Sequence, residues 1–145
     1  MNQSAVDVPS YAARREIGEA FRASQQAGDS AGLRKLLHDD IVWVLPGDNA
    51  VSGEAHGIDA IFARFATLAR FGVTITIEHI VLSRDGTAVI LHNTGAHEGK
   101  ALDEYLVSTL ELRNGLIARI DTYLSDLDMM NAYFGPKDPA PAPAP

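Results

Sequence analysis

Hydrophobic residues in the N-terminal half of the chain recur at helical spacing. After Ser10, a residue type that caps helix N-termini, Ile17 and Phe21 fall on one helical face. Gly28 and Gly72 mark two helix ends, because glycine readily adopts the left-handed conformation that follows a last turn. The pattern predicts helices from Ser10 to Gly28, from Asp29 or Ser30 over Leu33, Leu36 and Leu37, from Ile58 to Gly72, and after Asp126 over Leu127, Met130 and Phe134.

Short β-rich runs make up the rest of the pattern, and in the C-terminal half they alternate hydrophobic and polar residues. Ile41–Leu45 predicts a first strand, and a loop is expected from there to Gly57. The pairs Glu98–Gly99 and Asn114–Gly115 are typical of tight hairpin turns. Helices followed by an antiparallel meander indicate an α+β domain. The meander strands are predicted in VTITIEHIVL, TAVILHNTGAH, ALDEYLVSTLEL and LIARIDTYL.

Composition and charge narrow the functional classes. A chain of 145 residues with 46% hydrophobic and 21% charged residues is long enough to bury a core of its own. It has no cysteine, so neither a disulfide framework nor a thiolate zinc site is expected. The net charge of −7 argues against a nucleic-acid binder, which would carry a basic patch. Because neither a signal peptide nor a membrane-spanning run is recognised, a cytoplasmic protein is expected.

The two ends of the chain differ in composition from its middle. The C-terminal sequence GPKDPAPAPAP is rich in proline, which fixes φ and removes a backbone donor, so it is expected to stay out of helices and sheets. The predicted organisation is a flexible N-terminus over residues 1–10, one domain over residues 11–135, and a disordered Pro/Ala tail over residues 136–145.

Three stretches resemble the SnoaL-like family of the nuclear-transport-factor-like superfamily. They are AGDSAGLRKLLHDDIVWVLPG, GEAHGIDAIFARF and NGLIARIDTYLSD, and the resemblance extends over most of residues 11–134. That superfamily also includes ketosteroid isomerase, limonene epoxide hydrolase and polyketide cyclases. The resemblance implies a cone-shaped fold, in which a curved antiparallel sheet packs on the N-terminal helices and encloses a deep apolar cavity.

The catalytic residues of these families are absent from the matching positions. Where ketosteroid isomerase has a tyrosine, a general-base aspartate and a protonated aspartate, this chain has Phe21, Leu45 and Ser108. The histidine and aspartate of SnoaL-type cyclases match Ser108 and Thr122, and the last aspartate of limonene epoxide hydrolase also matches Thr122. The resemblance therefore implies a fold and a pocket without an inherited mechanism.

Strand alternation then selects the polar residues of the cavity. If Ser108 faces the cavity, so does Glu104, because alternate residues share a face. A turn at Glu98–Gly99 places Asn93 opposite Glu104. The resemblance also puts Leu91, Asn93, Gly95 and His97 on the inner face, with His97 nearer the rim. On this register the residues that face outward are Glu98, His92, Asp103, Asp121 and Tyr123. A slip of one residue would bring His92 and Asp121 inside instead and remove Glu104.

The predicted site uses Glu104 as acid or base, Asn93 as the orienting amide, and His97 as a third catalytic candidate. Burial raises a carboxyl pKa and favours proton transfer near neutral pH. The alternatives are that Glu104 lies at a solvated mouth and pairs with Lys100 or with nothing, and that the aromatic residues are plain core. The predicted substrate-binding residues are Phe21, Trp43, Leu45, Phe65, Leu91, Ser108, Leu110, Ile120 and Thr122.

These residues support two functional hypotheses. The first is a small cofactor-free enzyme, an isomerase, cyclase or dehydratase, that acts on a hydrophobic oxygenated metabolite; the resemblance suggests a polyketide. The second is a non-catalytic protein that binds a small molecule in the same pocket. The histidines lack metal-ligand spacing, so no metal is expected. The resemblance also implies a homodimer formed through the outer face of the sheet, where His92, Thr94, Asp121 and Tyr123 would lie.

Overall fold

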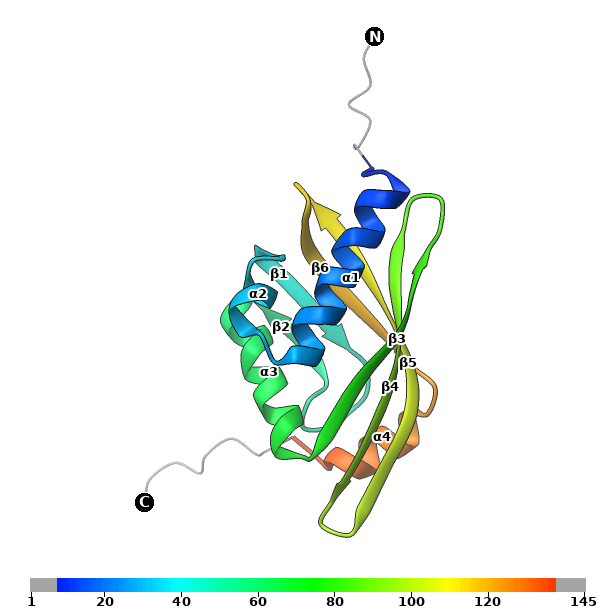
Figure 1. Cartoon of the computed structure of the whole chain (residues 1–145). Helices are drawn as coiled ribbons and strands as arrows, with labels where there is room; N and C mark the ends of the chain where they lie inside the picture. Colours follow the sequence, from blue (N-terminus) through cyan, green and yellow to red (C-terminus); the bar gives the residue numbers. More distant parts are fainter. Residues whose placement is uncertain (1–7, 138–145) are drawn as a thin grey trace, which may run out of the picture.

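Four helices lie against a curved, unclosed six-stranded sheet with the strand order β2-β1-β6-β5-β4-β3 (Figure 1). The computed structural model describes residues 8–137. The N-terminal helices cover one face of the sheet, and α4 lies at the end opposite the start of α1 (Figure 1). The elements are α1 (Tyr11–Ala27), α2 (Ser30–Arg34), β1 (Leu37–Leu45), β2 (Gly53–His56), α3 (Ile58–Arg70), β3 (Val73–Leu82), β4 (Thr87–His97), β5 (Lys100–Arg113), β6 (Leu116–Leu124) and α4 (Leu127–Phe134).

The predicted start and end of the first helix and the predicted start of the last helix are confirmed. The Ser10 hydroxyl accepts a hydrogen bond of 3.1 Å from the backbone N–H of Ala13, which satisfies a free donor of the first turn of α1. Gly28 ends the same helix with a φ of 67°. The Asp126 carboxylate caps α4 by accepting from the backbone N–H of Met129 at 2.9 Å. Local side-chain chemistry thus sets where these helices begin and end.

Both predicted hairpin turns are also confirmed. Glu98 and Gly99 have φ values of 51° and 79°, and Asn114 and Gly115 have values of 56° and 76°. Positive φ at both central residues gives a turn whose twist matches that of the flanking strands. The two turns therefore fix the pairing of β4 with β5 and of β5 with β6.

Three parts of the predicted pattern are wrong. The second helix ends at Arg34, and Leu37 begins β1 four residues before the expected start at Ile41. The strand β2 occupies residues 53–56, where a loop was expected. The polar residues of His38–Asp40 hide the start of β1, and the four residues of β2 are too few to show a period.

The sheet contains one parallel pair within an otherwise antiparallel arrangement. The pairs of the predicted meander, β3–β4, β4–β5 and β5–β6, are antiparallel, as is β1–β2. The pair β1–β6, second from one edge of the sheet, is parallel. This pair joins the N-terminal strands to the C-terminal meander, and the sequence pattern gives no local sign of such a distant pairing.

The helix α4 is held against the sheet by specific contacts. The Tyr133 hydroxyl donates a hydrogen bond to the backbone carbonyl of Phe71, and a Cβ atom at Gly95 would lie 2.6 Å from that hydroxyl oxygen. The side-chain carbonyl of Asn131 accepts from the Asn49 amide at 2.8 Å. These contacts fix α4 across the end of the sheet, where it helps to close the interior.

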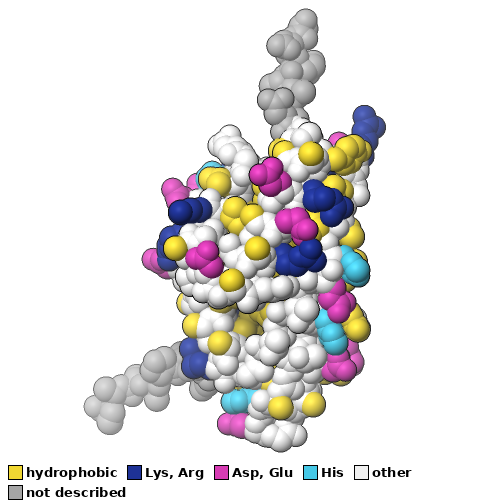
Figure 2. Space-filling model, viewed as in Figure 1, with side chains coloured by type: hydrophobic (Ala, Val, Ile, Leu, Met, Phe, Trp, Pro, Cys, Tyr) yellow, Lys and Arg dark blue, Asp and Glu magenta, His cyan; other side chains and the backbone are white. Residues whose placement is uncertain are grey.

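The convex face of the sheet carries the residues that were predicted to face outward. Tyr123 is 61% exposed, and the exposed Tyr105 ring stacks on His92 with centroids 4.3 Å apart. His92 Nε2 lies 2.5 Å from the Asp103 carboxylate. Dimerisation through this face stays a prediction. On the face that carries α1 and α3, charged and isolated hydrophobic side chains are interspersed (Figure 2).

Among residues 8–137, no helix is both long and apolar enough to cross a membrane. The flexible segment predicted at the N-terminus and the tail predicted at the C-terminus extend into the residues outside this range.

Arg14 joins α1 to the turn between β3 and β4. Its side chain is only 2% exposed, and its guanidinium group donates to the backbone carbonyls of Pro9, Ser83, Arg84 and Gly86. A planar guanidinium can serve several acceptors at once, and burial makes each of these bonds costly to lose.

We expect Arg14→Met to lower the free energy of unfolding by at least about 2 kcal/mol, because it leaves the carbonyls of the turn without their charged donor. Arg15→Met is the matched control, since Arg15 is exposed and makes one long contact of 3.4 Å to the Ile80 carbonyl. Urea unfolding measures both variants. Equal midpoints for the two would contradict the structural role of Arg14.

Candidate functional site

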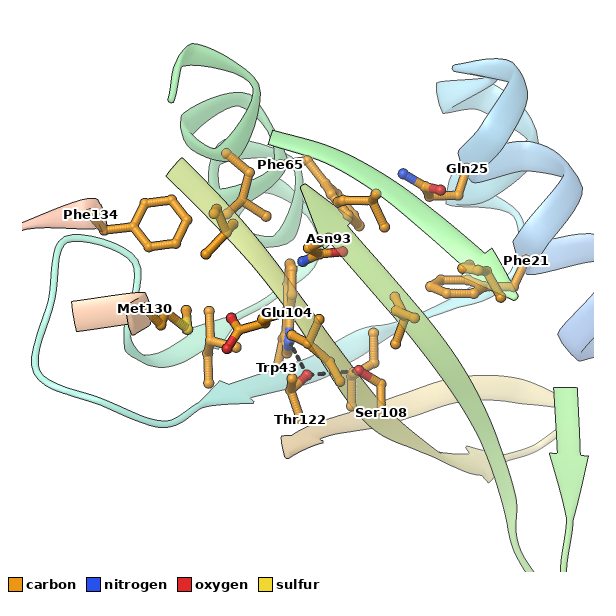
Figure 3. A pocket seen from close by; sticks show the side chains of 18 residues that line it. Phe21, Gln25, Trp43, Phe65, Asn93, Glu104, Ser108, Thr122, Met130 and Phe134 are labelled. Atoms are coloured by element: carbon orange, nitrogen blue, oxygen red, sulfur yellow. Dashed lines mark hydrogen bonds between the residues drawn. The ribbon is translucent and has the colours of Figure 1, made fainter. Parts of the chain in front are cut away.

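A pocket lies between the concave face of the sheet and the helices (Figure 3). Its volume is about 50 Å³, and alternate residues of each contributing strand point into it. Most of the lining is aliphatic or aromatic, and five residues bring polar groups: Gln25, Asn93, Glu104, Ser108 and Thr122. The apolar lining consists of Phe21, Trp43, Leu45, Phe65, Leu68, Ile75, Ile77, Leu91, Leu102, Leu106, Ile120, Met130 and Phe134.

The pairing of β4 with β5 puts Asn93 directly opposite Glu104, as predicted. The pairing of β5 with β6 puts Ser108 opposite Thr122 in the same way. All four residues line the pocket, so the alternative register with His92 inside is not the one adopted. The two-residue turns at the hairpin ends are sufficient to set this parity.

Glu104 is buried without a full set of hydrogen-bond partners. Its side chain is 2% exposed, and Oε2 has no partner among the described residues. Desolvation raises the pKa of Glu104 to about 7; the backbone N–H of Asp126 opposes this rise and the Asp126 charge adds to it. The alternative of a solvated Glu104 paired with Lys100 is therefore wrong. The carboxyl group is instead close to half protonated at neutral pH.

Two amides accompany the carboxyl group. Asn93 is 9% exposed and its Oδ1 atom has no partner within residues 8–137. Gln25 extends from α1 toward the same space, and its Oε1 atom is likewise buried and unpaired within that range (Figure 3). Unpaired buried polar atoms cost free energy, because water no longer solvates them. These atoms are therefore positioned to bond something that enters the pocket.

A hydrogen-bonded chain crosses the floor of the pocket (Figure 3). Trp43 Nε1 donates to Thr122 Oγ1 at 3.0 Å, and the Thr122 and Ser108 hydroxyls lie 2.8 Å apart. An indole nitrogen is only a donor, so Thr122 accepts from it. The bond between the two hydroxyls uses one of their two hydrogens, which leaves the other available to a ligand oxygen.

Arg64 holds Trp43, which together with Phe65 forms an aromatic wall of the pocket. Its guanidinium group donates to the backbone carbonyls of Trp43 at 2.9 Å and Gly53 at 3.0 Å, and it lies 4.9 Å from the Trp43 ring centroid. Burial lowers the pKa of Arg64 to about 10, so it keeps its charge at neutral pH. The Phe65 ring packs 5.2 Å from the Trp43 ring on the pocket side. The indole is thus held by a cation, a phenyl ring and a hydroxyl.

Most of the predicted pocket residues line the pocket, with two exceptions. Leu110 is buried in the core on the same face of β5 as Ser108, but it lies beyond the end of the pocket. His97 lies at the tip of the hairpin, where its ring packs 4.8 Å from the Phe71 ring and Nε2 is 3.8 Å from the Glu98 carboxylate. Alternation gives the correct face for both residues, but not how far the pocket extends along the strand.

The sequence analysis missed several lining residues. Gln25 follows Phe21 by one helical turn, so the helical period already placed it on the same face. Leu102 precedes Glu104 by two residues on β5, which is the same kind of signal. Met130 and Phe134 share a face of α4, and only the docking of that helix brings them to the pocket.

The polar groups of the lining can exchange a proton and form hydrogen bonds. Within residues 8–137, no group of three histidine or acidic side chains is close enough to hold a metal ion. The pocket offers one carboxyl group of raised pKa, two amides and a hydroxyl pair.

Comparison with known proteins places this arrangement in a family. Residues 18–120 match the SnoaL-like domain family. An uncharacterized protein of Mycobacterium tuberculosis strain H37Rv is 27% identical over 103 residues, which cover 68% of this chain and 79% of that protein.

Solved structures share the fold. Bal32a, from a soil-derived mobile gene cassette, is 24% identical with a TM-score of 0.80, and the match covers 86% of this chain and 98% of Bal32a. A candidate SnoaL-like polyketide cyclase from Jannaschia sp. CCS1 is 17% identical with a TM-score of 0.67, over 94% of this chain and 99% of that protein. At these identities the similarity shows the fold alone.

We expect Glu104 to make the protein less stable as the pH rises. Its folded-state pKa of about 7 lies above the ordinary value of 4.5, so the folded protein binds the proton more tightly. The stabilisation is fully present below pH 4.5 and is lost as the pH approaches 7. A tenfold change in proton affinity is worth about 1.4 kcal/mol, so the loss is on the order of 3 kcal/mol.

Glu104→Gln should remove this dependence, so its advantage over the parent should grow between pH 5 and pH 8. Glu111→Gln, on the same strand but exposed, should show no such trend. Urea unfolding across this pH range measures the difference for each variant. A constant difference between Glu104→Gln and the parent would show that the carboxyl group is not desolvated.

Proposed function

Because the chain belongs to the SnoaL-like domain family, we propose that its pocket takes up a hydrophobic, oxygenated small molecule and catalyses proton transfer on it. The reaction class is isomerisation, cyclisation or dehydration next to a carbonyl group. Each of these reactions begins when a base removes a proton from a carbon beside the carbonyl. Proton transfer of this kind requires no cofactor.

One observation carries the proposal: Glu104 and Asn93 lie side by side, nine-tenths buried or more, in an otherwise mostly apolar pocket. Each has a side-chain oxygen without a partner among the described residues. A carboxyl group in such a place destabilises the folded protein near neutral pH, so folding alone gives no reason for it. An acid–base role is consistent with its position and with its raised pKa.

The proposed chemistry follows from the lining. The Glu104 carboxylate removes a proton from the carbon beside the substrate carbonyl, and the electron pair moves onto the carbonyl oxygen as an enolate forms. The Asn93 amide and the free hydroxyl hydrogen of the Ser108–Thr122 pair supply hydrogen bonds to that oxygen. Glu104, now protonated, returns the proton to another carbon in an isomerisation. In a dehydration it protonates the departing hydroxyl group instead.

The rest of the lining supports binding and orientation. Trp43 and Phe65 offer flat apolar surfaces against which a ring can pack. The hydrogen bond to Thr122 and the stacked guanidinium group of Arg64 hold the indole in one orientation, so it does not have to be ordered when a ligand binds. The similarity to a candidate polyketide cyclase agrees with a ring-containing ketone as substrate, although it does not select one.

A non-catalytic binding protein is the second candidate. The observation that favours it is that Phe21, Leu45, Ser108 and Thr122 stand where related enzymes carry catalytic groups. In that case Glu104 and Asn93 would only hydrogen-bond the ligand.

Cyclohex-3-enone tests the proposal, because it is a one-ring ketone whose conversion to cyclohex-2-enone is a proton transfer. We expect the protein to accelerate this conversion, with a rate that rises with pH through about 7 as the carboxylate form appears. Glu104→Gln should lower the rate by at least about 100-fold. Ultraviolet absorbance of the conjugated product measures the rate.

Glu111→Gln is the matched control and should stay within about twofold of the parent, since its carboxylate is exposed. Binding of the ketone is measured in parallel by calorimetry. If the parent binds the ketone but leaves its conversion at the background rate, the enzymatic proposal is wrong and the binding function is favoured.

A further inference from the structure

We infer that the pocket is the inner half of a longer site, and that the groove between α1, α2, α3 and the start of β3 is its outer half. This inference rests on the proposed function, since both halves hold the same ligand. The groove has a volume of about 190 Å³. The structure assigns to the combined site an elongated, uncharged, mostly apolar molecule whose leading end carries a hydroxyl or carbonyl group.

The size of the inner pocket is the first argument. A volume of about 50 Å³ is roughly a third of the ~150 Å³ cavity that takes up one benzene ring, so even a single ring fills it completely and requires the lining side chains to shift. A ligand of two or more rings needs further room on the side from which it enters. The groove provides that room without displacement of a helix or a strand.

The second argument is that the pocket and the groove share a wall. Gln25, Phe65, Leu68 and Ile75 line both of them. We call these four residues the neck. The Gln25 and Phe65 side chains come from α1 and α3, and rotation of such side chains joins the two spaces. The Oε1 atom of Gln25, which is buried and has no partner in the described part of the chain, lies at this point, where a ligand passing through the neck would contact it.

The groove itself has the character of a ligand site. Its floor is formed by apolar side chains, which include Leu33, Phe62 and Val73, and its rim by the polar residues Ser24 and Ser30. The elements around it are joined by short connections, so the groove persists in the absence of a ligand. An apolar floor with a polar rim suits the trailing rings of a molecule whose polar end lies deeper.

The charged side chains that line the pocket and the groove indicate which apolar ligands can bind there. Among residues 8–137, those that line the pocket and the groove include two acidic ones, Glu104 and Asp29, and no lysine, arginine or histidine. Carboxylate ligands would therefore meet like charges and no cation. The unpaired oxygens of Gln25, Asn93 and Glu104 instead suit a ligand that donates hydrogen bonds, such as a phenol.

The test compares phenol, biphenyl-4-ol and biphenyl-4-carboxylate as probes of the full chain at pH 8. Ala69→Phe fills the groove, because Ala69 lines the groove and not the pocket. We expect this substitution to weaken binding of biphenyl-4-ol at least tenfold and to leave phenol within twofold. Ala66→Phe is the control, since Ala66 is exposed on the same helix and lines neither space. Biphenyl-4-carboxylate should bind the parent at least tenfold more weakly than biphenyl-4-ol.

A second measurement does not depend on the folding of a variant. In the parent protein, intermolecular NOEs should connect biphenyl-4-ol with the methyl groups of Leu33 and Val73, which line only the groove. Phenol should show NOEs to Ile120, which lines only the pocket.

The outcomes separate the two levels of the proposal. If biphenyl-4-ol binds without NOEs to Leu33 and Val73 and Ala69→Phe does not weaken it, the extended site is wrong and the proposed function stands. If neither phenol nor biphenyl-4-ol binds, the pocket is not a ligand site and both are wrong. Equal affinity for biphenyl-4-carboxylate would overturn the assignment of an uncharged ligand.

Discussion

The register of the β4–β5 hairpin is the constraint on which the site depends. Glu98 and Gly99 both take positive φ, and this two-residue turn leaves only one pairing of the strands that follow. That pairing brings Asn93 and Glu104 to the concave face and leaves Asp103 on the convex face. A shift of one residue would exchange the two faces while preserving the sheet. A local turn far from the pocket therefore decides which side chains reach it.

The interior has two kinds of polar group: some are fixed by hydrogen bonds within the protein, and others have oxygens that find no hydrogen-bond partner among the described residues. Trp43, Thr122 and Ser108 form a hydrogen-bonded chain, with the Arg64 guanidinium group behind the indole. Glu104, four residues before Ser108 on β5, and Asn93, opposite it on β4, retain oxygens without partners among the described residues. Natural proteins break the rule of polar satisfaction mostly at functional sites, where a ligand supplies the missing partner. The contrast between the two kinds of polar group supports the role proposed for Glu104.

The sequence predicted the fold where the signals were local. Ser10, Gly28 and Asp126 mark helix ends through their own backbone or side-chain chemistry, and the alternation around Glu104 gave its face correctly. The strand β2 was not predictable in this way because four residues are too few to show a period, and the parallel β1–β6 pair was not because it joins residues distant in the chain. The same limit applies to the candidate site. Periodicity gives the face on which Leu110 and His97 lie, but not where the cavity ends. No sequence pattern shows that Arg64 is buried and bound to two backbone carbonyl groups.

Trp43 is the single tryptophan of the chain, and it forms part of the pocket wall. The intrinsic ultraviolet emission of the folded protein therefore comes mainly from one indole with a known hydroxyl partner and a known cation beside it. The wavelength and intensity of this emission depend on the polarity of the space that the indole faces. The molecule carries its own optical reporter for whatever enters that space, and no dye or label has to be attached to follow it.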